Sequence, residues 1–203
     1  MANLFPLFLK LEGRHCLVVG GGGIAVQKLD GLLSAGANIH VVAPEADDRI
    51  RELVSDGQLS WSRREFRPAD LISTVLVVAA TGDPILNATV FGEAQSRGVL
   101  CNAVDEPRHC DFYYPAVVRR GDLQIAISTA GHSPALAQRI RKTLERQFDE
   151  NLGEWLTWLG NVRRLFFSRR IDPIRRRTAL HRIASQEVYE RFARARGRKE
   201  GGR

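Results

Sequence analysis

Four consecutive glycines near the start of the chain form the segment best suited to binding chemistry. Gly20, Gly22 and Ala25 have the spacing G-x-G-x-x-A, which is typical of backbone that binds a dinucleotide pyrophosphate. The first glycine permits a tight turn, the second lets the backbone approach the phosphates, and the alanine allows close packing of a helix on a strand. The helix N-terminus then offers N–H groups to the phosphates. The alternative is a glycine-rich turn that binds nothing.

Residues at the ends of two further apolar runs complete a candidate cofactor site. Pro44 and Glu45 follow one run, and an acidic residue at this place commonly binds the ribose hydroxyls of a dinucleotide. Ala80 and Thr81 follow another run and are candidates to line the nicotinamide side. No arginine directly follows the run before Pro44, which favours NAD over NADP.

Asp105 ends the next apolar run and is the candidate catalytic residue. A carboxylate beside a nicotinamide can act as a general acid or base. The alternative is a solvated turn residue that caps the following segment. A zinc site formed by Cys101, His109 and Cys110 is a further alternative, but no fourth ligand has a recognised spacing, and we expect no resident metal.

Strands and helices alternate through residue 104 and must position these side chains. Short apolar runs predict strands over residues 16–19, 38–43, 59–62, 75–79 and 100–104. Apolar residues at helical spacing predict helices over residues 25–35, 47–54 and 84–97. This order predicts an α/β fold with a Rossmann-type, doubly wound parallel sheet. Ligands bind at the carboxyl ends of such strands, where all the candidate residues lie.

The pattern changes after Asp105. Residues 111–118 and 123–128 read as two strands joined by a hairpin connection over 119–122. Helices are expected over residues 135–148, 154–169, 173–184 and 186–195. We therefore predict an NAD-binding domain over residues 1–112, a small α+β region over 113–150 and a helical domain over 151–203. The basic, glycine-containing segment 194–203 is expected to be disordered.

The charge of the chain is uneven. Lys and Arg number 30 against 23 Asp and Glu, which gives a net charge of +7. Residues 163–203 hold 14 basic and 4 acidic residues, whereas residues 1–162 hold 16 and 19. An anionic small molecule, a nucleic acid and a membrane surface are all partners that such a basic end could attract.

The apolar segments and the cysteines indicate the cellular compartment of the protein. No apolar run approaches the ~18 residues of a membrane span, and the apolar segment Leu4–Leu9 lacks a preceding basic region typical of a secretory signal. Cys16 and Cys101 lie in apolar runs and are interpreted as small core residues. These features predict a protein of the reducing cytoplasm.

Several segments together resemble a known family. They are Leu7–Glu12, Cys16–Lys28, Asn102–Asp105 and Ser128–Ala137, together with Phe112 and Pro115. In this order they are similar to the dehydrogenase/chelatase module of the siroheme synthases, the precorrin-2 dehydrogenase and sirohydrochlorin ferrochelatase family. The methyltransferase domain of the fused enzymes does not occur in the 203 residues, so we expect a stand-alone form.

The resemblance implies an activity and a set of roles. The reaction is the NAD-dependent oxidation of precorrin-2 to sirohydrochlorin, with insertion of Fe²⁺ into sirohydrochlorin in some relatives. Gly23, Ile24, Pro44 and Glu45 match positions that contact NAD, and Asp105 matches an aspartate implicated in both reactions. The family architecture further implies that residues 113–150 form a homodimer.

A hydroxyl-rich loop also carries the resemblance. Thr129, Gly131, His132 and Ser133 are expected to bind the carboxylates of the tetrapyrrole substrate. Helix capping is the alternative for Ser133, because Pro134 suits the first helical position. His132 is open to three interpretations: a donor to substrate carboxylates, a ligand on the path of the metal, or a surface residue. His109 carries the same ambiguity.

Two rival functions remain. A different Rossmann oxidoreductase would act on another substrate, and an NAD-sensing regulator would bind nucleic acid through the basic end. The C-terminal arginines lack a recognisable helix-turn-helix or interleaved aromatic residues, so we expect neither a nucleic-acid nor a membrane partner. We instead expect residues 163–182 to help capture the polycarboxylate substrate.

Overall fold

The computed structural model describes residues 4–200. The chain divides into two compact units, Met1–Tyr113 and Tyr114–Arg203. This division lies next to the boundary expected at residue 112. The further boundary expected at residue 150 stays a prediction, as does the dimerisation role of residues 113–150.

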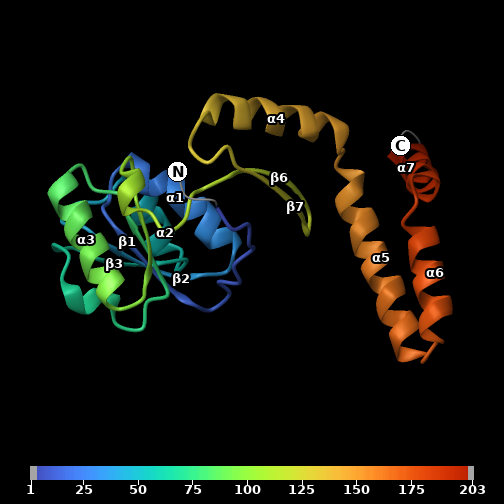
Figure 1. Cartoon of the computed structure of the whole chain (residues 1–203), viewed down its shortest axis with the longest axis horizontal. Coiled ribbons are helices and arrows are strands. Elements are labelled where there is room, and N and C mark those ends of the chain that lie inside the picture. The colour runs from blue at the N-terminus through green and yellow to red at the C-terminus, as the bar shows by residue number, and fades with distance from the viewer. Residues whose placement is uncertain (1–3, 201–203) are drawn as a thin grey trace. The chain divides into compact units, whose positions relative to one another are not determined.

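A five-stranded parallel sheet forms the centre of the first unit, with strand order β3-β2-β1-β4-β5 (Figure 1). Its strands are β1 (His15–Val19), β2 (Asn38–Val42), β3 (Ser60–Ser62), β4 (Leu76–Ala79) and β5 (Leu100–Ala103). Its helices are α1 (Gly23–Ser34), α2 (Asp48–Ser55) and α3 (Pro84–Ser96), with 3₁₀ turns η1 (Pro68–Leu71) and η2 (Pro107–His109). The strand order reverses direction between β1 and β4, which is where doubly wound sheets bind ligands. The predicted α/β, Rossmann-type fold is confirmed.

The sheet is buried on both faces, as its apolar strands predict. Leu17 and Val77 belong to a core cluster on the face that receives Val90 of α3. Side chains alternate between the faces of a strand, and Val18 and Val41 are fully buried on the opposite face. This packing fixes the strand ends that carry the candidate cofactor residues.

The second unit contains an antiparallel hairpin and a set of helices. The hairpin pairs β6 (Ala116–Arg120) with β7 (Leu123–Ile127). The helices are α4 (Pro134–Gln147), α5 (Asn151–Ser168), α6 (Pro173–Ile183) and α7 (Gln186–Glu200). Helices α4 and α5 both contact the hairpin, and α5 lies beside α6 (Figure 1). Within residues 4–200, no helix is both long enough and apolar enough to span a membrane.

The hairpin differs from the expectation in its bounds. Strand β6 begins at Ala116 rather than Asp111, because the Asp111 carboxylate accepts hydrogen bonds from the Cys101 N–H and from Gln95. That contact ties the start of the expected strand to β5. Arg119 and Arg120, expected in the connection, instead belong to β6.

The C-terminal helix is longer than expected. Helix α7 continues through Glu200, whereas residues 194–203 were expected to be disordered. Arg191 and Arg194 each form an ion pair with a glutamate one turn earlier, and such pairs stabilise a helix. The last three residues of the expected disordered segment lie outside the described residues.

Candidate functional site

The tight turn predicted at Gly20 is present. Its φ is +116°, and a Cβ atom built there would lie 2.4 Å from the Ala80 carbonyl oxygen. The Gly20 N–H donates to the Val42 carbonyl oxygen over 2.9 Å. Only glycine fits this position, where β1 turns away between the ends of β2 and β4.

Gly21 has a role that the motif did not predict. A Cβ atom on Gly21 would lie 2.1 Å from the Glu45 carbonyl oxygen. The Gly21 carbonyl oxygen also accepts a hydrogen bond from the Asp47 N–H over 2.7 Å. Gly21 therefore packs the glycine turn directly against the loop that carries Pro44 and Glu45.

Gly22 and Gly23 face open space instead. A Cβ atom on either would meet nothing within 4 Å. Gly22 is the N-cap of α1, and no side chain of the described residues caps this helix end. The first N–H groups of α1 are thus available to a ligand, and an anion is the ligand that a helix N-terminus favours. This arrangement fits the pyrophosphate of a dinucleotide.

A cleft of about 740 Å³ lies over these strand ends. Most of the predicted cofactor-binding residues line it: Gly20, Gly22, Gly23, Ile24, Pro44, Glu45, Ala80 and Thr81. Ala25 is fully buried instead, which suits its predicted packing role. A second group of lining residues was not predicted from the sequence, namely Gly21, Glu65, Phe66, Gly82, Asp83 and Leu86. Glu65 and Phe66 follow β3, so the rule that ligands bind beyond strand ends could have found them.

The charges of the cleft favour NAD over NADP. In the part of the chain that the structure describes, the charged lining residues are Glu45, Glu65 and Asp83, all carboxylates. These would repel the additional phosphate of NADP, whereas a carboxylate can accept hydrogen bonds from ribose hydroxyls.

Thr81 is held in place by a buried amide. The Thr81 N–H donates to Asn87 Oδ1 over 3.2 Å, and Asn87 Nδ2 donates back to the Thr81 carbonyl oxygen over 3.3 Å. The Thr81 hydroxyl has acceptors in Asn87 Oδ1 and the Asp83 carbonyl oxygen. Asn87 is only 4% exposed, so these bonds fix the loop after β4 that forms one wall of the cleft.

Asp105 lies at the same edge of the sheet, just after β5. The preceding residue, Val104, donates its N–H to the Ala79 carbonyl oxygen over 2.9 Å. Asp105 is exposed, and its φ of +63° is a left-handed conformation uncommon outside glycine. Among the described residues, its carboxylate has no hydrogen-bond or ion-pair partner. Asp105 is not part of the cleft lining, so its catalytic role stays a prediction.

Cys101 in β5 and Cys110 after this strand act as structural groups. Burial raises the pKa of Cys101 to about 12, and burial also raises the pKa of Cys110, whose thiol donates to the Ala103 carbonyl oxygen. His109 lies 5.0 Å from the Phe91 ring, measured between ring centroids. Within residues 4–200, no three His, Cys, Asp or Glu side chains gather as metal ligands would.

The hydroxyl-rich loop belongs to the second unit. Ser133 is the N-cap of α4, since its hydroxyl accepts the Leu136 N–H over 3.1 Å, so the capping role is confirmed. Thr129 Oγ1 accepts the Ser133 N–H over 3.2 Å and keeps its own proton to donate. Gly131 has a φ of +82°, and His132 is exposed. Substrate binding by these residues stays a prediction.

Comparisons with known proteins find matches in both parts of the chain. A family model described as putative NAD(P)-binding matches residues 7–116, and one described as sirohaem biosynthesis protein central matches residues 120–147. The siroheme synthase of Photorhabdus laumondii is 42% identical over 161 residues, which is 79% of this chain and 34% of that protein. That of Nitrosococcus oceani is 37% identical over 191 residues, which is 92% of this chain and 40% of that protein.

A solved structure is similar over nearly its whole length. The structure titled SirC, precorrin-2 dehydrogenase matches with a TM-score of 0.77 and 31% identity, and the match covers 95% of this chain and 98% of that one. By contrast, the chain spans about a third of the length of the first curated relatives. The expectation of a stand-alone module stays a prediction.

Proposed function

The chain belongs to the family of the siroheme synthases and precorrin-2 dehydrogenases, and from this premise we propose that it oxidises precorrin-2 to sirohydrochlorin with NAD. One observation carries the proposal. An open helix N-terminus and a glycine turn lie at the switch point of the sheet. The chain that carries them matches the structure titled precorrin-2 dehydrogenase over 95% of its own length and 98% of that structure's length.

The cofactor residues have separate tasks. When bound, NAD supplies the acceptor for a hydride. The N–H groups at the start of α1 bind its pyrophosphate, and Gly22 and Gly23 leave the space for it. Glu45 accepts hydrogen bonds from ribose hydroxyls, and Ala80 and Thr81 form the wall on the nicotinamide side.

Asp105 accepts a proton from the substrate. Oxidation of the macrocycle removes two electrons and one proton as a hydride, together with a second proton that a base must take. The Asp105 carboxylate is exposed and has no partner among the described residues, so it is available as that base.

The loop of the second unit binds the substrate carboxylates. The Thr129 hydroxyl retains a proton to donate, and His132 is exposed with two ring nitrogens. Gly131 and Ser133 shape this loop at the start of α4.

The arginines of α5 and α6 guide the polycarboxylate substrate to the protein. Within the described chain, the arginines of residues 163–182 form no ion pair, and the carboxylate of Asp172 caps α6. Arg176 instead lies 3.9 Å above the centre of the Phe167 ring. By contrast, Arg191 and Arg196 of α7 pair with glutamates. Unpaired guanidinium groups attract anions more strongly than paired ones.

The second unit also forms a homodimer. Its apolar side chains remain partly exposed, including Leu136, Ile140, Trp158 and Leu165 at 37–45%. A second copy would remove this surface from water, and such a gain drives association. Light scattering after size exclusion should give twice the chain mass, whereas a monomer at micromolar concentration would contradict the dimer.

The reaction takes place in the cytoplasm. Cys16 and Cys101 are buried free thiols, as the sequence predicted. Buried thiols without disulfides suit a reducing compartment.

Incubation of the full chain with NAD and precorrin-2 tests the proposal, with NADH absorbance as the readout. NADH should form only when both are present, and NADP should be a poorer acceptor. Sirohydrochlorin with Fe²⁺ as substrate then tests chelation, for which Asp105 would accept pyrrole protons. No NADH from precorrin-2 would favour another oxidoreductase, and tight salt-sensitive binding of DNA would favour the regulator.

A further inference from the structure

The loop after β3 forms one wall of the cleft, and few hydrogen bonds between strands hold it in place. Glu65 and Phe66 line the cleft, and Phe66 also packs against the core cluster beneath the sheet. Strand β3 has only three residues and lies at the edge of the sheet, paired with β2 alone. Ladder hydrogen bonds hold such a short edge strand weakly, so other contacts must fix the loop that follows it.

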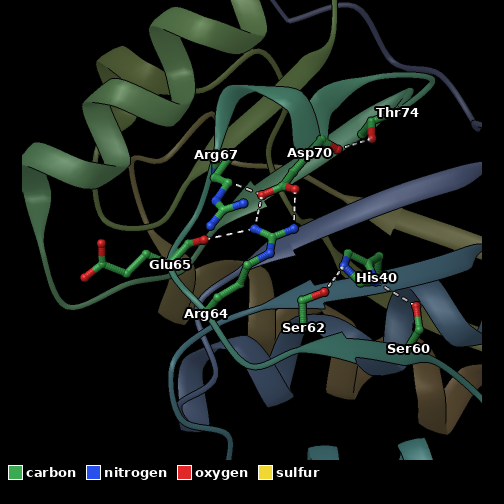
Figure 2. A network of polar contacts seen from close by, with 8 residues as sticks. All are labelled: His40, Ser60, Ser62, Arg64, Glu65, Arg67, Asp70 and Thr74. Atoms are coloured by element: carbon green, nitrogen blue, oxygen red, sulfur yellow. Dashed lines mark hydrogen bonds and ion pairs between the residues drawn. The ribbon is translucent and has the colours of Figure 1, made fainter.

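An ion pair supplies the strongest of these contacts. Arg64 donates from Nη2 to Asp70 Oδ1 over 2.6 Å and from Nη1 to Asp70 Oδ2 over 2.8 Å (Figure 2). The Arg67 N–H donates to the same Oδ2 over 2.8 Å. Arg64 Nη1 also donates to the Glu65 carbonyl oxygen over 2.9 Å. The Asp70 carboxylate thus closes the loop around Glu65 and Phe66.

The pair is more buried than the other ion pairs of this unit. The Asp70 side chain is 9% exposed and that of Arg64 is 33% exposed, whereas the Arg49–Glu52 pair on α2 is 53% and 64% exposed. Burial on its own would raise the pKa of Asp70, but the hydrogen bonds from Arg64 and the Arg67 N–H outweigh it and hold the pKa below its usual value. The carboxylate therefore stays ionised and keeps its arginine.

Further bonds join the same segment to the neighbouring loop after β2. Trp61 Nε1 donates to the Ala43 carbonyl oxygen over 2.9 Å, and Arg63 Nε donates to the Pro44 carbonyl oxygen over 3.3 Å. Ala43 and Pro44 lead into Glu45. The loop after β3 is thereby tied to the loop after β2, and both line the cleft.

A histidine secures the base of the loop. His40 Nδ1 lies 2.7 Å from Ser60 Oγ, and His40 Nε2 lies 3.1 Å from Ser62 Oγ (Figure 2). These bonds join β2 to β3 through their side chains. Together with the ion pair, these bonds fix the segment from Ser60 to Asp70 against β2.

We propose that the Arg64–Asp70 ion pair positions Glu65 and Phe66 as the wall that contacts the adenosine half of the dinucleotide, and so sets NAD affinity without a part in hydride transfer. The inference rests on the proposed NAD-dependent function. The glycine turn after β1 places the pyrophosphate at the centre of the sheet edge. With Asp105 and the nicotinamide on the β4–β5 side, the adenosine half extends over β2 and β3.

Replacement of Asp70 by Asn and of Arg64 by Gln tests this role. Calorimetry on the full chain should show NAD binding about tenfold weaker in each variant, with a double variant no weaker than the singles. At saturating NAD, kcat for precorrin-2 should stay within about twofold of the wild type while KM for NAD rises. The exposed pair provides the control, because Arg49→Gln and Glu52→Gln should leave NAD binding unchanged.

The outcome separates this inference from the proposed function. Well-folded Asp70→Asn and Arg64→Gln variants that bind NAD as the wild type does would overturn the positioning role. A loss of kcat with unchanged NAD affinity would overturn it as well. If Asp70→Asn does not fold, Asp70→Glu keeps the charge but displaces the loop, and the same weaker binding is expected. A wild type that binds NAD but leaves precorrin-2 unchanged would refute the proposed activity alone, since calorimetry still decides the role of the pair.

Discussion

The two units of the chain bury their apolar side chains to different degrees. The largest fully buried side chains, such as Leu17, Ile39 and Leu71, all lie in the first unit. In the second unit, the buried apolar residues are Val118, Ala137 and Trp155 within the described part. The first unit therefore has an extensive buried core, whereas the second buries few apolar side chains of its own. All residues that line the cleft lie in the first unit, so the proposed cofactor site can be tested separately from the proposed substrate loop of the second unit.

Asp105→Asn should give the largest effect. The change removes the proposed base but no hydrogen bond or ion pair among the described residues, so kcat should fall by about 10²- to 10⁴-fold. NAD affinity should stay unchanged, because Asp105 does not line the cleft. Single-turnover kinetics and calorimetry measure the two quantities. Full activity in this variant would mean that another group takes the proton.

Two glycine variants test the glycine turn of the first unit. Gly21→Ala places a Cβ atom 2.1 Å from the Glu45 carbonyl oxygen, so it should lower the free energy of unfolding by about 1–3 kcal/mol and weaken NAD binding. Gly22→Ala meets only open space and should weaken NAD binding with little loss of stability. Denaturant unfolding and calorimetry separate these results. Equal NAD binding by Gly22→Ala and the wild type would argue against a pyrophosphate at this turn.

Arg120→Ala removes contacts that lie within the second unit only. Arg120 Nε donates to the Phe148 carbonyl oxygen over 2.7 Å, and Nη2 donates to the Glu145 carbonyl oxygen over 2.8 Å. Loss of these bonds should cost about 2–3 kcal/mol of stability. NAD affinity should not change if the cleft of the first unit is independent. Arg119→Ala is the matched control, since Arg119 is the exposed neighbour.

The first unit should lose stability in mild acid through His40. Burial lowers the pKa of His40, with a smaller opposing effect of Asp70 and a supporting one of Arg64. The unfolded chain therefore binds this proton more readily than the folded one. Stability should be full above about pH 6.5 and should decrease as the pH falls below that value towards the lowered folded pKa. Urea unfolding of His40→Gln should show a free energy of unfolding that changes less with pH than that of the wild type. Replacement of the exposed His15 should leave the pH dependence as it is in the wild type.

Deletion of residues 194–203 should have the smallest effect. It removes the Arg194–Glu190 and Arg196–Glu154 ion pairs, whose side chains are all at least half exposed. Exposed pairs contribute at most about 1 kcal/mol. The KM for precorrin-2 should stay nearly constant, and a large increase would show that the end of α7 contacts the substrate.

The contrast between the units also explains which features the sequence could predict. The alternation of strands and helices and the glycine motif are local patterns, so the sheet, its cleft and Ala25 beneath it were predictable. The role of Gly21 was not predictable, because it arises where the loop after β2 lies against the glycine turn. No local pattern shows that Gly21 will meet Glu45.

The errors in the second half have a similar origin. Asp111 stands in an apolar, strand-like run, but its carboxylate receives hydrogen bonds from Cys101 and Gln95, which are distant in the sequence. The composition of residues 194–203 resembles that of disordered segments, yet Arg196 pairs with Glu154 of α5. In both places, contacts across the fold outweigh the local pattern.

A single-turnover reaction of the full chain tests directly whether the protein couples the oxidation of precorrin-2 to the reduction of NAD. NAD and a limiting amount of precorrin-2 are mixed with excess protein, and NADH and sirohydrochlorin are quantified together. One NADH should form for each sirohydrochlorin, at a rate that Asp105→Asn lowers without loss of NAD binding. Saturation with NAD while precorrin-2 remains unchanged would contradict this coupling.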